Sequence, residues 1–119
     1  MSLVSIIMPF YKKEPYIENS IKSILNQSYQ NFEIILINDD VENRDFIKEI
    51  SNLDERIILI QNSKNLGAGL SRNKGIAVSK GEFIAFCDCD DLWKKNKLEF
   101  QLSFMKQFNL NFSFTSYEI

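Results

Sequence analysis

Four short apolar runs, each bounded by polar or turn-forming residues, recur along the chain. They are rich in β-branched residues and show no alternation, as expected for strands that are buried on both faces of a parallel sheet. We therefore predict strands near residues 3–9, 33–38, 56–61 and 82–87. A fifth segment, NFSFTSY at residues 111–117, alternates in polarity and predicts an edge strand.

Between these runs, apolar residues recur at helical spacing. The pattern predicts one helix over residues 15–28, with Pro15 in its first turn, a weaker helix before the third strand, and a helix over 95–108. Gly67, Gly69 and Gly75 indicate a tight loop that leads into a further helix, packed closely on the sheet. The three apolar stripes are Ile17, Ile21, Ile24 and Leu25; Phe46, Ile47, Ile50 and Leu53; and Leu98, Leu102, Met105 and Phe108.

Alternation of strands and helices over the whole chain fixes the expected fold class. It predicts an α/β protein, a three-layer sandwich with a central, mostly parallel sheet and helices on both faces. No linker, internal repeat or low-complexity segment interrupts the pattern, so residues 1–119 are expected to form a single domain.

Composition and charge exclude several classes of function. The chain is 45% hydrophobic and 25% charged with a net charge of −2, which is ordinary for a globular protein and gives no electrostatic case for nucleic acid. The apolar runs are too short to span a bilayer and no signal peptide opens the chain, so we expect a cytoplasmic protein, with membrane association of a full-length form left open. The absence of histidine excludes histidine bases and His-ligated zinc. Cys87 and Cys89 are expected to be two small thiols, buried or half-buried.

Polar clusters follow three of the four predicted strands. In open α/β sheets, ligands bind outside the carboxyl ends of the parallel strands, so clusters at these ends predict a shared crevice. Taken singly, each cluster is equally typical of a solvated turn or a helix N-cap. The clusters are Pro9-Phe10-Tyr11, Asn38-Asp39-Asp40 and Asp88-Cys89-Asp90-Asp91.

The third cluster suits a divalent cation. Asp88 and Asp90 form an Asp-x-Asp pair at the end of a buried strand, where Mg²⁺ or Mn²⁺ can be shared with phosphate oxygens. The cation would remove the repulsion between the carboxylates and neutralise charge on a leaving diphosphate. Asp91 is expected to point elsewhere and to cap a helix that begins at Trp93, with the indole at the helix start.

Two long stretches, VSIIMPFYKKEPYIENSIKSILNQSYQNFEIILINDD and NLGAGLSRNKGIAVSKGEFIAFCDCDDLW, resemble the amino-terminal half of a family 2 glycosyltransferase with the GT-A fold. The resemblance runs from Val4 to about Tyr117. It implies a nucleotide-diphosphate-sugar donor, usually a UDP-sugar, and metal-assisted transfer with inversion to an acceptor sugar or lipid-linked glycan. The expected setting is polysaccharide or surface-glycan synthesis.

The resemblance also implies roles for residues on the base side of the donor site. Pro9 and Tyr11 would line the base pocket, with Tyr11 stacking on the uracil. Asp39 would accept a hydrogen bond from the ring N–H of the base, and Arg72 would reach the base or a phosphate. Glu14 falls at the acidic position of the first loop.

On the diphosphate side, Asp88 would face the ribose or the donor sugar, and Asp90 would bind the metal. The family continues beyond this length into an acceptor-binding half that carries the general base, so the base is expected beyond Ile119. The predicted nucleotide-sugar site is Pro9, Phe10, Tyr11, Glu14, Asp39, Arg72, Asp88, Cys89 and Asp90, with Asp90 and Asp88 as metal ligands.

Two positions depart from the family pattern. Lys12 stands where the family usually has asparagine, and Asp40 stands where the Asp-Asp-Gly-Ser motif has glycine. The second acid of that motif is kept as Asp39. Because glycine adopts positive φ more readily than aspartate, the backbone path at Asp40 is left open.

Three other functions remain as alternatives. A sugar nucleotidyltransferase should have a glycine-rich basic loop after its first strand, and a phospho-receiver domain should have an acidic pair there. This chain has neither in PFYKKEPY. The third alternative is a nucleotide-binding fragment without catalysis.

Overall fold

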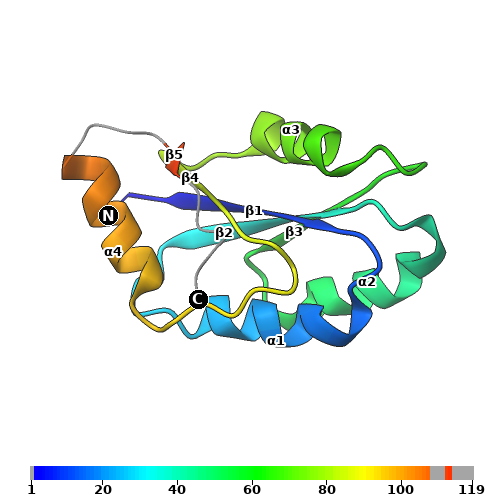
Figure 1. Ribbon diagram of the computed structural model, residues 1–119, viewed down its shortest axis with the longest axis horizontal. Helices are drawn as coiled ribbons and strands as arrows, with labels where there is room; N and C mark the ends of the chain where they lie inside the picture. The colour runs from blue at the N-terminus through cyan, green and yellow to red at the C-terminus, as the bar shows by residue number, and fades with distance from the viewer. Residues whose placement is uncertain (1, 108–111, 114–119) are drawn as a thin grey trace.

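A five-stranded parallel sheet forms the centre of the computed structural model, which describes residues 2–107 and 112–113. The strands lie in the order β3-β2-β1-β4-β5, and every neighbouring pair is parallel (Figure 1). This confirms the predicted fold class. Strand bounds are β1 (Val4–Phe10), β2 (Phe32–Asn38), β3 (Ile57–Gln61), β4 (Phe83–Phe86) and β5 (Phe112–Ser113).

Helices cover both faces of the sheet and give three layers. Figure 1 shows α3 on one side and α1 and α2 on the other. Among the described residues, no helix is long and apolar enough to cross a membrane. The helices are α1 (Glu14–Leu25), α2 (Arg44–Ile50), α3 (Ala68–Val78) and α4 (Lys97–Gln107), with 3₁₀ turns η1 (Val41–Asn43) and η2 (Ser51–Leu53) flanking α2.

The predicted helices differ from the observed ones mainly at their ends. α1 ends at Leu25 rather than at residue 28, and α4 begins at Lys97 rather than at residue 95. Leu53 was expected on the buried stripe of α2, but α2 ends at Ile50 and Leu53 lies exposed in η2. Phe108 and most of the segment 111–117 lie outside the described residues, whereas Phe112–Ser113 forms the expected edge strand.

Successive side chains along the strands are buried in turn on the two faces of the sheet, in two hydrophobic cores of unequal size. Ile7, Ile35 and Ile37 form the smaller core, on the face covered by α3. On the opposite face, alternate residues of β1 and β2 join the buried stripes of α1 and α4. Because both faces are covered, the central strands carry apolar side chains at nearly every position.

The approach of α3 to the sheet depends on Gly75. A Cβ atom at this position would lie 2.8 Å from Ile37 Cδ1 and 2.9 Å from Ile7 Cγ2, closer than carbon atoms pack. The close packing predicted from the glycines is therefore present at Gly75. It sets the position of the amino-terminal end of α3 above the carboxyl edge of β1 and β2.

Candidate functional site

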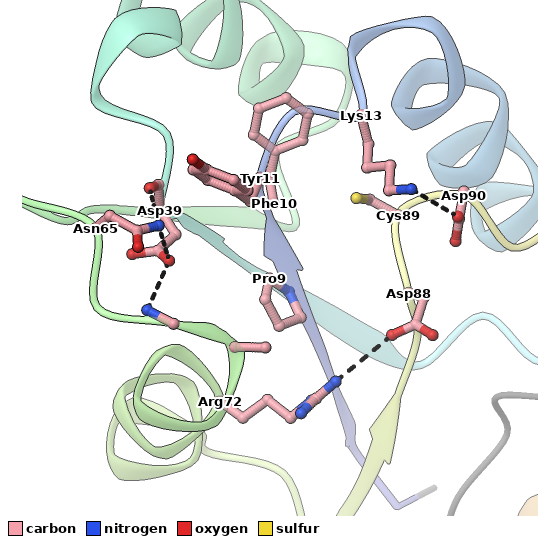
Figure 2. Close-up of a pocket in the computed structure, with 12 residues that line it drawn as sticks. Pro9, Phe10, Tyr11, Lys13, Asp39, Asn65, Arg72, Asp88, Cys89 and Asp90 are labelled. Carbon is pink, nitrogen blue, oxygen red and sulfur yellow. Dashed lines mark hydrogen bonds and ion pairs between the residues drawn. The ribbon is translucent and has the colours of Figure 1, made fainter.

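A cavity of about 370 Å³ opens at the carboxyl edge of the sheet (Figure 2). Its walls come from the ends of β1 and β2, the start of α3 and the segment after β4. All the residues predicted for the site except Glu14 line it. The lining residues are Pro9, Phe10, Tyr11, Lys13, Asp39, Asn65, Gly67, Ala68, Arg72, Asp88, Cys89 and Asp90.

Strand register brings Tyr11 and Asp39 together. Phe10 pairs with Asn38, and the backbone N–H of Asp39 donates to the Phe10 carbonyl at 2.9 Å. Tyr11 is 45% exposed, and the Lys12 ammonium lies 5.2 Å from the centroid of its ring. The Tyr11 ring is therefore available to a ligand.

Asp39 is buried and accepts hydrogen bonds on both carboxylate oxygens. Oδ1 accepts from Asn62 Nδ2 at 2.9 Å and from the backbone N–H of Leu66 at 2.7 Å. Oδ2 accepts from Asn65 Nδ2 at 2.8 Å and from the backbone N–H of Gly67 at 2.9 Å. Since a carboxylate offers about four lone-pair positions, protein donors fill all of them.

These contacts keep Asp39 ionised. Burial acts to raise the pKa of its carboxyl group, but hydrogen bonds from Leu66, Asn62 and Gly67 outweigh it, and the pKa is lowered. The same bonds hold the turn at residues 65–67, where Gly67 has φ +92°, a backbone conformation that other residues rarely adopt. Three of the four donors are backbone or buried groups. Asn65 is the exposed one and lines the cavity.

Two ion pairs between basic and acidic side chains lie in another part of the cavity, away from Asp39. Lys13 Nζ lies 3.4 Å from Asp90 Oδ2, and Arg72 Nη2 lies 3.7 Å from Asp88 Oδ1. Figure 2 shows Lys13, Asp88 and Asp90 on the opposite side of Pro9 from Asp39 and Asn65, whereas Arg72 extends from α3 below Pro9 toward Asp88. The side chains are partly exposed, so the ion pairs are weak and exchangeable.

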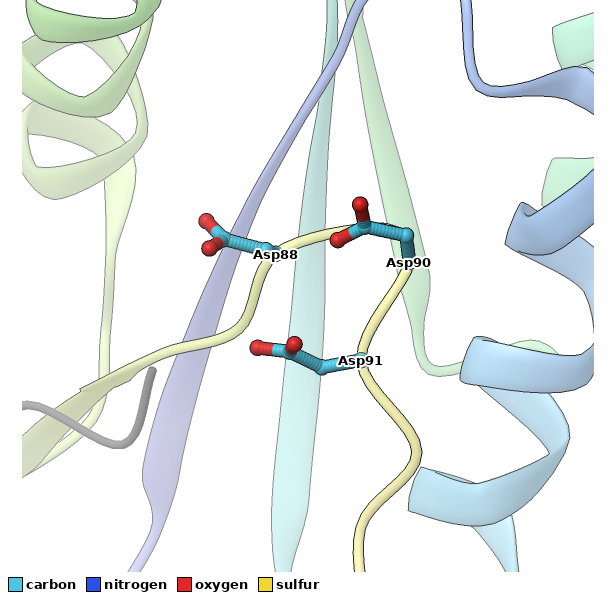
Figure 3. Close-up of side chains that lie close together, drawn as sticks. All are labelled: Asp88, Asp90 and Asp91. Carbon is cyan, nitrogen blue, oxygen red and sulfur yellow. The ribbon is translucent and has the colours of Figure 1, made fainter. Parts of the chain in front are cut away.

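Asp88, Asp90 and Asp91 form an acidic cluster after β4 (Figure 3). Each offers an oxygen atom, and these atoms lie within 4.8 Å of one another. Among the described residues, the buried Asp91 Oδ2 has no hydrogen-bond partner. Burial raises the pKa of Asp91, and the charges of Asp88 and Asp90 raise it further. Three convergent carboxylates with one unpaired oxygen fit a hard divalent cation.

The expected role of Asp91 as a helix cap is wrong, and so is the expected helix start at Trp93. α4 begins four residues after Trp93, at Lys97, and the indole is 5% exposed within the core. The Trp93 backbone N–H donates to Ser23 Oγ of α1 at 3.0 Å. Because α1 holds this segment as irregular chain, Asp91 stays beside the other two acids.

Both cysteines are free and buried, as predicted. Burial raises the pKa of the Cys87 thiol strongly and that of Cys89 to about 12. Cys89 therefore lines the cavity as a neutral thiol, and the carboxylates of Asp88 and Asp90 beside it supply the negative charge.

The two departures from the family pattern have different structural consequences. Lys12 has φ 54°, in the left-handed region that asparagine tolerates better than lysine. Asp40 has φ −113°, so no glycine is needed there, and its side chain accepts from Glu42 N. Glu14 lies outside the cavity lining, and its carboxylate accepts from Asn43 Nδ2 at 2.7 Å.

Sequence reasoning missed four residues that line the cavity: Lys13, Asn65, Gly67 and Ala68. Gly67 was interpreted only as a turn residue. The asparagine-glycine pattern of NLGAG, placed just before a helix at the carboxyl edge, was the available signal for the group at residues 65–68.

Comparisons with known proteins agree on one family. The model described as "Glycosyl transferase family 2" matches residues 5–118. A putative teichuronic acid biosynthesis glycosyltransferase, TuaG of Bacillus subtilis, is 41% identical over 98% of the chain and 47% of its own length. A second relative is WfgD of Escherichia coli, a UDP-Glc:alpha-D-GlcNAc-diphosphoundecaprenol beta-1,3-glucosyltransferase. It is 44% identical over 98% of this chain and 46% of its own length. The chain thus spans about half the length of these curated relatives.

Solved structures share the fold. The crystal structure of S. aureus TarS in complex with UDP superposes with a TM-score of 0.78, at 27% identity, over 92% of this chain and 33% of that one. A mannosyltransferase from Pyrobaculum calidifontis, in complex with GDP-Man and Mn²⁺, has the same TM-score at 19% identity. The match covers 86% of this chain and 32% of that one.

Proposed function

Because this chain belongs to glycosyl transferase family 2 and has the GT-A fold, we propose that it is the donor-binding domain of an enzyme that transfers a sugar from a UDP-sugar to an acceptor hydroxyl, with inversion. The observation that carries the proposal is the cavity lined by Tyr11, Asp39 and two members of the acidic cluster, Asp88 and Asp90. Asp91 is not a lining residue, but its carboxylate lies within 4.8 Å of theirs. TarS, which binds UDP, and WfgD, whose name specifies a UDP-glucose donor, support the choice of nucleotide.

On the base side, the exposed face of Tyr11 stacks on the uracil. Asp39 accepts the hydrogen bond from the ring N–H of the base. Since all four acceptor positions of Asp39 are filled, one protein donor must leave when the base enters. Asn65 is the donor that can leave, because its side chain is exposed at the cavity.

On the diphosphate side, Asp88, Asp90 and Asp91 would hold Mn²⁺ or Mg²⁺, which when bound neutralises charge on the leaving diphosphate. Lys13 and Arg72 line the same cavity and supply positive charge near the phosphates. In this proposal, Lys13 and Arg72 exchange their acidic partners for phosphate oxygens.

The acceptor and the general base belong to the rest of the enzyme in this proposal. Glu99, a carboxylate after Trp93, is not among the cavity residues and accepts a hydrogen bond from Ser28 Oγ at 2.7 Å. The names of the relatives support an acceptor in cell-surface glycan synthesis, such as a lipid-linked glycan. A chain that binds UDP but transfers no sugar would be the non-catalytic alternative.

Replacement of single acids tests the proposal. Asp90→Asn is expected to weaken Mn²⁺–UDP binding by about tenfold or more, equal to about 1.4 kcal/mol, because a charged ligand of the cation is lost. Asp88→Asn should weaken it less. Asp91→Asn should also weaken it, since its carboxylate lies in the cluster. Isothermal titration calorimetry measures the three affinities.

Two controls accompany this titration. Asp45→Asn changes an exposed aspartate of α2 outside the cavity and should leave the affinity unchanged. EDTA should abolish binding of UDP to the parent chain and affect uridine much less, because uridine carries no diphosphate. If Asp90→Asn bound Mn²⁺–UDP like the parent chain, the assignment of the acidic cluster would be wrong.

A further inference from the structure

Asn62, the residue directly after β3, links Asp39 to α3. Its side chain is 1% exposed, and both ends of its amide are engaged. Nδ2 donates to Asp39 Oδ1 at 2.9 Å and to Ser71 Oγ at 3.1 Å. Oδ1 accepts from Lys74 Nζ at 2.7 Å. Asn62 therefore stands between a carboxylate of the cavity and an ammonium group outside it.

The backbone of Asn62 is held as firmly as its side chain. Its N–H donates to the Asn38 carbonyl at 2.9 Å, and its carbonyl accepts from Arg44 Nη1 at 2.9 Å. β2, α2 and α3 therefore all contribute to the placement of one amide. Such fully satisfied buried networks are rigid.

Lys74 determines which way the Asn62 amide faces. If the amide were reversed, Oδ1 would face the Asp39 carboxylate and the NH₂ group would face the Lys74 ammonium. Two attractive contacts would then become two repulsive ones. The charge of Lys74 thus selects the orientation in which Asn62 donates to Asp39.

We propose that Lys74 and Asn62 are positioning residues for base recognition, which hold the Asp39 carboxylate in the orientation that receives the ring N–H of the uracil. This inference rests on the proposed function. Neither residue lines the cavity, so both act through Asp39. If Asn65 leaves when the base enters, Asn62 becomes the one side-chain amide that still fixes the carboxylate, beside the N–H groups of Leu66 and Gly67.

Recognition of the ring N–H can be measured by itself with an analogue. UDP and 3-methyl-UDP differ only by a methyl group on the ring nitrogen, so the ratio of their affinities reports the contact with Asp39. For the parent chain with Mn²⁺, we expect UDP to bind about tenfold more tightly than the analogue, as for a hydrogen bond to a charged acceptor. Calorimetry gives both dissociation constants.

Lys74→Met should lower the affinity for UDP about threefold to tenfold and leave that for 3-methyl-UDP unchanged, so that the ratio falls toward one. Lys74→Arg keeps a cationic donor and should preserve the parent ratio. Lys48→Met, which removes an exposed lysine of α2, is the matched control and should change neither affinity. Lys74→Met leaves the buried Oδ1 of Asn62 without its ammonium donor, so its Tm should fall by several degrees. Both affinities are therefore measured well below that Tm.

The outcomes separate the inference from the proposed function. A parent ratio retained in Lys74→Met overturns the inference and leaves the proposed function standing. Equal losses for UDP and the analogue also overturn it, because they indicate a general structural role. A parent chain that binds no UDP in the presence of Mn²⁺ overturns both.

Discussion

At Asp39, a buried carboxylate is kept ionised by donors from four other residues. Their contribution exceeds the cost of burial, since the pKa of Asp39 is lowered. The residue therefore acts twice. It organises the turn at residues 65–67, and in the proposed function it accepts a hydrogen bond from the ring N–H of the base.

The lowered pKa makes part of the stability depend on pH. A group whose pKa is depressed in the folded state stabilises that state above its unfolded pKa, and the effect is lost as pH falls through the folded value. The ordinary value for Asp39 is 3.8. The stability difference between the parent chain and Asp39→Asn should be about 1–3 kcal/mol near neutral pH and shrink below about pH 4. Urea denaturation over a pH series measures it, and a constant difference down to the most acidic point would contradict the assignment.

Among the elements, α3 depends most on small residues. It carries Gly69 on its exposed first turn and Gly75 where it meets the sheet. Nothing lies within 4 Å of a Cβ at Gly69, whereas a Cβ at Gly75 would overlap Ile37 and Ile7. The same substitution on one helix should therefore have opposite effects at these two positions.

Gly75→Ala is expected to destabilise the chain by about 1–3 kcal/mol, because the methyl group must push α3 away from the sheet. Gly69→Ala should stabilise it by about 0.5–1 kcal/mol, because alanine loses less backbone entropy in a helix. Chemical denaturation of both variants gives the comparison. Equal effects of either sign would show that α3 does not pack as closely as described.

For the whole molecule, the cavity is an assembly of segments far apart in the sequence. The end of β1, the end of β2, the start of α3 and the segment after β4 all contribute lining residues. A ligand that touches all of them binds the folded chain and not the unfolded one. Binding should therefore stabilise the whole domain.

Mn²⁺ with UDP at about 100 times the dissociation constant should stabilise the folded chain by about 2.7 kcal/mol and raise Tm by roughly 5–15 °C. Circular dichroism during heating measures the shift. Asp90→Asn at the same ligand concentration should show a much smaller one. An unchanged parent Tm at this ligand concentration would mean that the folded chain does not bind Mn²⁺ with UDP.

The sequence by itself determined the architecture and the edge at which the site lies. Continuous apolar runs and a period of 3.6 residues are local properties, so the strands, the helices and the parallel fold class were predictable. The polar clusters directly after three buried strands also predicted most of the residues that line the cavity, because parallel strands end at one edge of the sheet. The resemblance to the family supplied the proposed roles of Tyr11, Asp39 and Asp90, which no local pattern contains.

Only the tertiary structure decided which side chains meet. Trp93 joins the core because α1 holds the chain after the acids, and this keeps Asp91 with Asp88 instead of on a helix. Lys74 reaches Asn62 because close packing at Gly75 sets the distance between α3 and the sheet. Such contacts depend on strand register and helix placement between residues that are distant in the chain. Sequence spacing does not specify these distances, so the orientation of Asp39 and the composition of the acidic cluster became evident only in the folded molecule.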